Sequence, residues 1–212
     1  MTTASIQSAH DVLDFWFGTL PLDKPALDAR MKVWFAGESD PTAAAHYDEQ
    51  IRTKLVPLLN KAVNDQLEGW SASPRRRLAL ILLFDQVPRN AFRSTAAAYS
   101  FDDRALALTV EGLRDAADAP LDPVERLFFY MPLQHAELRS AQEESVRLFR
   151  RLSQEAPGEL QPTFAGVLQY AVKHAEIIRQ FGRFPYRNQV LQRQSTPEEE
   201  LWLSESGESF GQ

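Results

Sequence analysis

The feature that most constrains this chain is a repeated pair in which a helix-capping side chain stands directly before a proline. The pairs are Asp40-Pro41, Ser73-Pro74, Asp122-Pro123 and Thr196-Pro197. Asp, Ser and Thr accept hydrogen bonds from the free amides of a first helical turn, and proline at the next position lacks only an amide that had no helical partner. Glu125 and Glu199 add a capping-box pattern at Thr196 and a close relative of it at Asp122. Four such starts predict helices and argue against strands.

The apolar residues between these starts recur at helical spacing. Leu106, Val110 and Leu113 are separated by four and three residues, and 164–181 repeats the same steps. No stretch alternates strictly enough to predict a sheet. We therefore predict an all-α fold, with boundaries good to a few residues. The helices are expected near 8–17, 27–35, 41–65, 74–87, 102–117, 123–151, 162–181 and 197–203, and the tail from about 205 is expected to be frayed.

A weak internal repeat favours a particular helical architecture. The tripeptide His135-Ala136-Glu137 recurs as His174-Ala175-Glu176, each on a long predicted helix that begins beside a proline. Offsets of this size are typical of stacked antiparallel helix pairs, as in tetratricopeptide arrays. No tetratricopeptide consensus is legible, so a regular array is not expected.

The composition bounds the class of protein. The chain has 212 residues, of which 44% are hydrophobic and 25% charged, which predicts one globular domain over 1–212. A net charge of −6 argues against nucleic-acid binding. The absence of cysteine excludes disulfides and thiol nucleophiles. The N-terminus has no secretory pattern, and the longest apolar run, 78–84, is too short to span a membrane, so we expect a soluble cytoplasmic protein.

Asp85 is the first candidate site residue. It follows the apolar run and shares a helical stripe with Leu78 and Ile81. Near the predicted end of its helix, a buried carboxylate needs a cationic or hydrogen-bonding partner. Two interpretations remain: a structural clamp with Arg89, or an Asp that faces a ligand. We predict that Asp85 pairs with at least one of Arg89, Arg183 or Arg187.

His135 and His174 lie on the core-facing sides of their predicted helices. Each is either a hydrogen-bonded core residue or a site residue, and their equivalent positions favour the second interpretation somewhat. Neither His-x-Glu pair can chelate a metal from a regular helix, because residues two apart point about 200° apart. We predict no metal site and no cofactor. No Gly-x-Gly-x-x-Gly, P-loop or Gly-x-Ser-x-Gly motif is present.

A cluster of arginines marks the loop after the helix that contains His174. Arg179, Arg183, Arg187 and Arg193 occur there without any acid between them. Several arginines on a loop beside a helix end can bind carboxylate or phosphate; the alternative is salt bridging to the chain's many acids. The five acidic residues after position 197 are expected to form a solvated face.

Four segments resemble a bacterial family known as domain of unknown function 924. They are 12–18 (VLDFWFG), 80–90 (LILLFDQVPRN), 128–137 (FFYMPLQHAE) and the stretch from 174 through 181–188 (FGRFPYRN) to 199. The resemblance spans nearly the whole chain. It implies a tetratricopeptide-like superhelix of antiparallel helix pairs and no established activity. It also implies that the matched polar residues gather in one place, namely Asp85, Gln86, Arg89, Asn90, His135, Glu137, His174, Arg183, Arg187 and Asn188.

Three hypotheses for function follow. The leading one is a cytosolic binding or scaffold protein whose polar cleft takes a small anion or an acidic peptide segment. The second is a hydrolase-like enzyme in which a histidine acts as general base beside Asp85 or Glu137. The third is a structural oligomer subunit anchored by Trp34, Trp70 or Trp202. A histidine nitrogen bonded to a carboxylate, both open to one pocket, would favour the enzyme; histidines sealed in apolar packing would favour the other two.

Overall fold

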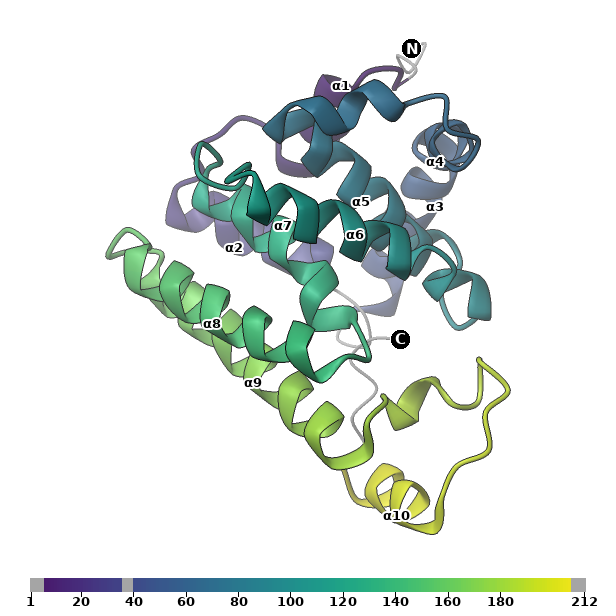
Figure 1. The fold of residues 1–212 in the computed structure, drawn as a ribbon. Coiled ribbons are helices and arrows are strands. Elements are labelled where there is room, and N and C mark those ends of the chain that lie inside the picture. Colours follow the sequence, from purple (N-terminus) through teal and green to yellow (C-terminus); the bar gives the residue numbers. More distant parts are fainter. Residues whose placement is uncertain (1–5, 36–39, 207–212) are drawn as a thin grey trace.

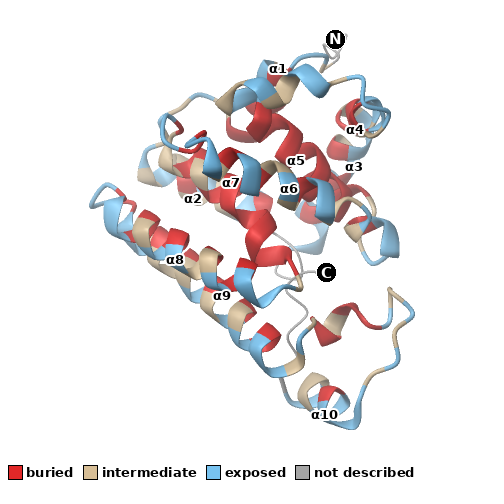
Figure 2. Ribbon diagram, in the orientation of Figure 1, coloured by how far each residue is buried: buried red, intermediate tan, exposed pale blue. Residues whose placement is uncertain are grey.

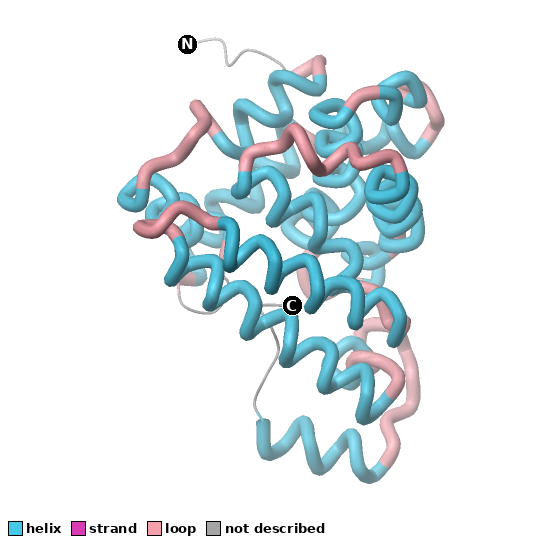
Figure 3. The backbone as a smooth tube through the Cα atoms, turned by 60° about the vertical axis from the view of Figure 1, so that its left-hand side comes forward, coloured by secondary structure: helices cyan, strands magenta, loops and turns pink. Residues whose placement is uncertain are grey.

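The computed structural model describes residues 6–35 and 40–206, and within them it contains helices and loops but no strand (Figure 3). The predicted all-α class is therefore confirmed for this part of the chain. The α-helices are α1 (Ala9–Phe17), α2 (Lys24–Trp34), α3 (Pro41–Lys54), α4 (Val56–Val63), α5 (Pro74–Ala91), α6 (Asp102–Arg114), α7 (Pro123–His135), α8 (Arg139–Glu155), α9 (Gln161–Phe181) and α10 (Pro197–Ser206). Short 3-10 helices lie at η1 (Glu68–Ala72), η2 (Ala96–Tyr99) and η3 (Pro185–Arg187).

Two helices, α5 and α7, form the interior. Every residue of α5 from Arg77 to Ala91 is buried, and α7 is buried over nearly its whole length (Figure 2). Helices α1, α3, α4, α6 and α7 all contact α5, which explains why its run 78–84 is apolar on every side. The ring of Phe128 on α7 meets those of Trp16, Phe17 and Trp34 edge to face, and these aromatic side chains join α1 and α2 to the core.

The C-terminal part is built on a helical hairpin. Helices α8 and α9 lie side by side and α8 also packs on α7, while η3 and α10 lie beyond the C-terminal end of α9 (Figure 1). Gly182 ends α9 in the left-handed conformation, with φ of 72°. A small second apolar cluster of Ile177, Ile178 and Phe184 forms under the following loop. The hairpin thus carries the arginine-rich loop against the end of α7.

Most predicted helix starts use the caps seen in the sequence. Asp40 accepts a bond from the amide of Ala43, and complete capping boxes form at Asp122 with Glu125 and at Thr196 with Glu199. Ser73 is different: α5 begins at Pro74 as predicted, but the Ser73 side chain makes no capping bond.

Two long predicted helices are wrong, because each is split in the structure. The predicted helix 41–65 breaks at Leu55, where α4 restarts with Pro57 in its first turn, a position at which proline costs no helical bond. The predicted helix 123–151 breaks after His135, and Ala136 and Leu138 adopt extended backbone. The side chain of Gln142 then donates to the carbonyl oxygens of Gln134 and Ala136, which satisfies groups that a continuous helix would have used.

The predicted end of α5 at position 87 is also wrong. The helix passes through Pro88 and continues to Ala91. Side chains supply donors in this last part, because Arg89 Nη1 donates to the carbonyl oxygen of Asp85 at 2.8 Å and Asn90 Nδ2 to that of Gln86 at 2.9 Å. At the other end of the chain, α10 runs to Ser206, beyond the predicted end at 203, and the rest of the predicted frayed tail lies outside the described residues.

A search of the described helices finds none with the length and apolar character needed to cross a membrane.

Candidate functional site

Asp85 lies at the centre of a buried polar cluster. Because α5 extends to Ala91, Asp85 stands inside the helix rather than at its end, and its exposed fraction is 1%. Its Oδ1 accepts a bond from His135 Nδ1 at 2.7 Å and lies 3.1 Å from Arg89 Nη1, while Gln86 Nε2 bonds Oδ2. The predicted pairing of Asp85 with an arginine is therefore confirmed for Arg89. The other two candidate arginines bond elsewhere.

Arg89 connects this carboxylate to a second one. Its two terminal nitrogens bond Asp102 Oδ1 and Oδ2 at 2.7 and 2.9 Å and so form a bidentate pair. Asp102 is the first residue of α6, where a negative charge is also stabilised by the helix dipole. Arg89 thus joins α5 to the start of α6 and balances two carboxylates from within the core.

The charges of the cluster set its protonation states. Burial alone would raise the pKa of Asp85, but the positive charge of Arg89 and the hydrogen bonds from His135 and Gln86 outweigh it and lower that pKa. For His135, burial and the nearby Arg89 lower the pKa below the usual value despite the bond to Asp85. The imidazole is therefore neutral at pH 7. With Nδ1 as the donor to the ionised Asp85, Nε2 is left as the basic nitrogen.

Arg187 closes the cluster from the C-terminal loop. Its Nη1 donates to the carbonyl oxygen of His135 at 3.0 Å and lies 3.5 Å from Asp102 Oδ2. Aromatic rings cover the guanidinium, since the centroids of Phe184 and Tyr99 lie 4.4 and 4.6 Å from its central carbon. The side chain is almost fully buried, yet its Nε–H has no hydrogen-bond partner among the described residues.

Glu137 belongs to a neighbouring pair rather than to the Asp85 cluster. Its carboxylate accepts two bonds from Arg193, at 2.6 and 2.9 Å, and one from the backbone amide of Phe184 at 2.8 Å. Burial would raise the pKa of Glu137, but these donors outweigh it and lower that pKa. The pair attaches the loop after α9 to the short connection between α7 and α8.

Arg183 and Asn188 meet around Glu199. Arg183 bonds both oxygens of Glu199, at 2.6 and 2.7 Å, and Asn188 Nδ2 adds a bond at 3.1 Å. Chiefly because of the bond from Arg183, the pKa of Glu199 is lowered to about 2. The expectation that the acids after position 197 form a solvated face is wrong for Glu199, which is buried. This carboxylate holds α10 to the loop.

His174 and Asn90 flank the cluster without joining it. His174 Nδ1 donates to the carbonyl oxygen of Tyr170, one turn earlier on α9, and its ring meets Phe184 edge to face. Burial lowers the pKa of His174 to about 3, so it too is neutral. Asn90 bonds backbone of its own helix and accepts a bond from Arg93 Nη2 at 3.3 Å.

The residues predicted to gather thus divide into two connected groups and two flanking residues. Asp85, Gln86, Arg89, His135 and Arg187 form one network, and Glu137, Arg183 and Asn188 belong to the loop contacts beside it. The predicted set of site residues left out several partners that complete these networks, namely Tyr99, Asp102, Arg193 and Glu199. Three of them carried a signal: Arg193 belongs to the arginine cluster, Asp102 opens a predicted helix, and Glu199 completes a capping box. Among the described residues, no group of three or more His, Asp or Glu side chains is arranged to hold a metal ion.

The fold and site together define a class, an all-helical protein whose interior holds a charge-balanced network of carboxylates and arginines around a neutral histidine. Residues 12–207 match the model of the family described as bacterial protein of unknown function (DUF924), and the chain belongs to that family. A solved protein of unknown function from Agrobacterium tumefaciens, ATU0120, is 34% identical, with a TM-score of 0.67 over 86% of this chain and 99% of that chain. A search of curated proteins returns no significant match.

We predict that Asp85→Asn lowers the free energy of unfolding by about 1–3 kcal/mol, because charge-assisted bonds to Arg89 and His135 are lost inside the protein. Arg89 keeps its pair with Asp102, which limits the loss. Urea denaturation at pH 7 measures the change, with the exposed Asp103→Asn on α6 as the matched control. A loss no larger than that of the control would show that the carboxylate contributes nothing to stability.

Acid should destabilise the fold through its buried histidines. The unfolded chain binds a proton at His174 near pH 6.5, while the folded protein does not do so until about pH 3. The unfolded state therefore gains protons first, and the free energy of unfolding falls as the pH drops below 6.5, by at most about 1.4 kcal/mol per pH unit for each such group. His174→Gln should reduce this slope between pH 6.5 and 5. Equal slopes in the variant and the unmodified protein would contradict the assignment.

Proposed function

We propose that this protein is a cytosolic binding protein that takes a small carboxylate or phosphate ligand at Arg187. The observation that carries the proposal is the buried Nε–H of Arg187, which has no partner among the described residues. A buried donor without an acceptor costs free energy and calls for an explanation. Side-on binding of a carboxylate uses this nitrogen together with a terminal one.

The pairing of the neighbouring arginines supports Arg187 as the ligand-binding one. Arg89, Arg183 and Arg193 each bond both oxygens of one carboxylate at 2.6–2.9 Å. Among the carboxylates of the described residues, Arg187 contacts only Asp102, at 3.5 Å, which is long for a charge-assisted bond. A ligand anion can replace that contact without leaving Asp102 unpaired, because Asp102 keeps its bonds to Arg89. The half-buried rings of Tyr99 and Tyr186 lie on the guanidinium and form the more exposed side of the cluster.

A thermal-shift screen with carboxylate and phosphate metabolites tests this proposal. At least one ligand at millimolar concentration should raise the melting temperature of the unmodified protein by several degrees, since a ligand that binds only the folded state stabilises it. The shift should vanish in Arg187→Ala and shrink in Arg187→Lys, which keeps the charge but lacks the planar fork.

The control for that screen is Arg183→Ala, in the same loop, with each variant compared with its own ligand-free melting temperature. It should retain the shift, because Arg183 is already bound by Glu199. No stabilising anion in the panel, or a full shift in Arg187→Ala, would refute binding at this arginine.

A second candidate function is acid–base catalysis by His135. The specific observation in its favour is the 2.7 Å bond between His135 Nδ1 and Asp85, which orients a neutral imidazole with Nε2 as the base. Against it stands the burial of both side chains, 8% exposed for His135 and 1% for Asp85. The protein thus has the bond between a histidine and a carboxylate that the catalytic function requires, but both side chains are buried. Binding therefore remains the preferred function.

The catalytic alternative has its own test. It predicts hydrolysis of an activated ester such as p-nitrophenyl acetate above the rate of the buffer, lost in His135→Gln and kept in His174→Gln. Rates that are equal in the two variants would exclude a special role for His135. The variant Arg187→Ala leaves the pair of His135 and Asp85 in place. Binding at Arg187 predicts that this variant loses the ligand-induced rise in melting temperature, and catalysis by His135 predicts that it keeps the hydrolysis. The two measurements therefore separate the two functions.

We also infer a tetratricopeptide-like order of helix pairs. In support of it, consecutive helices from α5 to α9 each pack on the next one in the chain. A regular rotation between successive pairs in a crystal structure would agree with this order, and an irregular arrangement would contradict it.

A further inference from the structure

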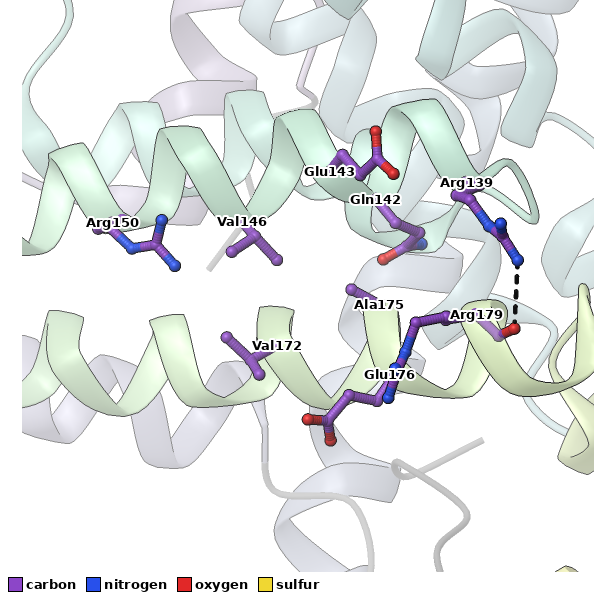
Figure 4. A pocket seen from close by; sticks show the side chains of 9 residues that line it. All are labelled: Arg139, Gln142, Glu143, Val146, Arg150, Val172, Ala175, Glu176 and Arg179. Carbon is purple, nitrogen blue, oxygen red and sulfur yellow. Dashed lines mark hydrogen bonds between the residues drawn. The ribbon is translucent and has the colours of Figure 1, made fainter.

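We propose that the outer groove between α8 and α9 binds an extended acidic peptide segment, at a site separate from Arg187. The groove has a volume of about 420 Å³ and is lined by both helices of the hairpin (Figure 4). Val146, Val172 and Ala175 point into it, and the arginines Arg139 and Arg150 lie toward its two ends. Such a volume falls in the range of pockets that hold a small ligand or a few residues of peptide.

The groove gathers three arginines that have no carboxylate partner among the described residues. Most arginines of the described chain pair with a carboxylate. Arg139, Arg150 and Arg179 in the groove make no ion pair with any described residue, and elsewhere in the described chain the same holds for Arg30 and Arg76. Arg139 only donates to the carbonyl oxygen of Arg179, at 3.3 Å. Three arginines without carboxylate partners beside an apolar floor therefore offer charge complementarity to acidic groups of a partner.

Gln142 supplies an independent sign of a partner that is a peptide. Its Nε2 donates to the carbonyl oxygens of Gln134 and Ala136, at 2.7 and 2.8 Å, and because carbonyl oxygens only accept, these bonds fix which end of the amide is nitrogen. The remaining oxygen, Oε1, is buried without a donor among the described residues, and the side chain lines the groove. A donor can reach Oε1 only when exposed side chains of the groove change rotamer. Exposed side chains do so within nanoseconds.

These features together select the ligand. A fully ionised small anion can pair with arginine but has no donor for Gln142 and no apolar surface for the two valines. A peptide main chain has an N–H at every residue and carries apolar side chains. Arg139 and Arg150 are eleven residues apart on α8, about 16 Å along the helix. Five residue steps of extended chain cover the same distance. Glu143 and Glu176, also in the lining, disfavour acids in the middle of the segment.

The probe is the labelled peptide acetyl-Glu-Val-Ala-Val-Leu-Glu-amide, measured by fluorescence anisotropy with the full chain. We expect saturable binding in the micromolar range. The double variant Arg139→Gln/Arg150→Gln should weaken it at least tenfold, and methylation of the central peptide nitrogens, which removes donors for Gln142, should weaken it at least threefold. The matched control is Arg76→Gln, an exposed arginine of α5 without an ion pair among the described residues, which should bind as the unmodified protein does.

Three results would overturn the proposal. The first is no binding at millimolar protein. The second is equal binding of a peptide with Gln in place of both Glu residues. The third is equal weakening by Arg76→Gln and by the double variant, which would mean that the peptide responds to net charge alone. Failure of this experiment leaves the Arg187 proposal unaffected, because Arg187→Ala is tested with different ligands and a different readout.

Discussion

A single buried carboxylate at the end of the apolar run of α5 dictates much of this structure. Asp85 cannot remain buried as an unpaired anion, since the effective cost in a protein interior is several kcal/mol. It is compensated by Arg89 from its own helix and by His135 from α7. Arg89 also binds a second carboxylate, that of Asp102, and this pair places the start of α6 beside α5. The requirement at one residue thus fixes how three helices meet at the end of the core.

The same requirement extends to the C-terminal loop. Arg187 is drawn to the carbonyl oxygen of His135, and the pairs Glu137–Arg193 and Arg183–Glu199 hold the chain before and after it. Each of these carboxylates has a lowered pKa, so the loop is fastened by charged groups and not by a large apolar contact. Within the described part of the chain, the buried members of the apolar cluster beneath the loop are Ile177, Ile178 and Phe184. Electrostatic pairing therefore positions the part of the site that presents Arg187.

Whether a feature could be predicted from the sequence depends on how far apart in the chain its interacting residues lie. Helix starts at Pro41, Pro74, Pro123 and Pro197 depend on neighbouring residues, and they were predictable. The break after His135 was not, because Gln142 from another helix stabilises it. The break at Leu55 had a local signal in Pro57, which the prediction of one continuous helix did not use. Likewise, the sequence shows that the loop is rich in arginine. Which carboxylate each arginine binds depends on how α10 and the end of α7 pack against the loop. The sequence showed that Asp85 needs a partner and did not show that Asp102 shares it.

Gln142 provides a physical connection between the two proposed sites. Its amide nitrogen bonds the carbonyl oxygens of Gln134 and Ala136, the residues on either side of His135. The side chain lines the groove of the hairpin, and its oxygen is buried beneath it. A hydrogen bond accepted at one end of an amide polarises it and strengthens donation at the other end. A peptide N–H at Oε1 would thus tighten the segment that carries His135, whose carbonyl oxygen in turn accepts the bond from Arg187. Because binding free energies are reciprocal, any such tightening that favours an anion at Arg187 must favour the peptide to the same degree.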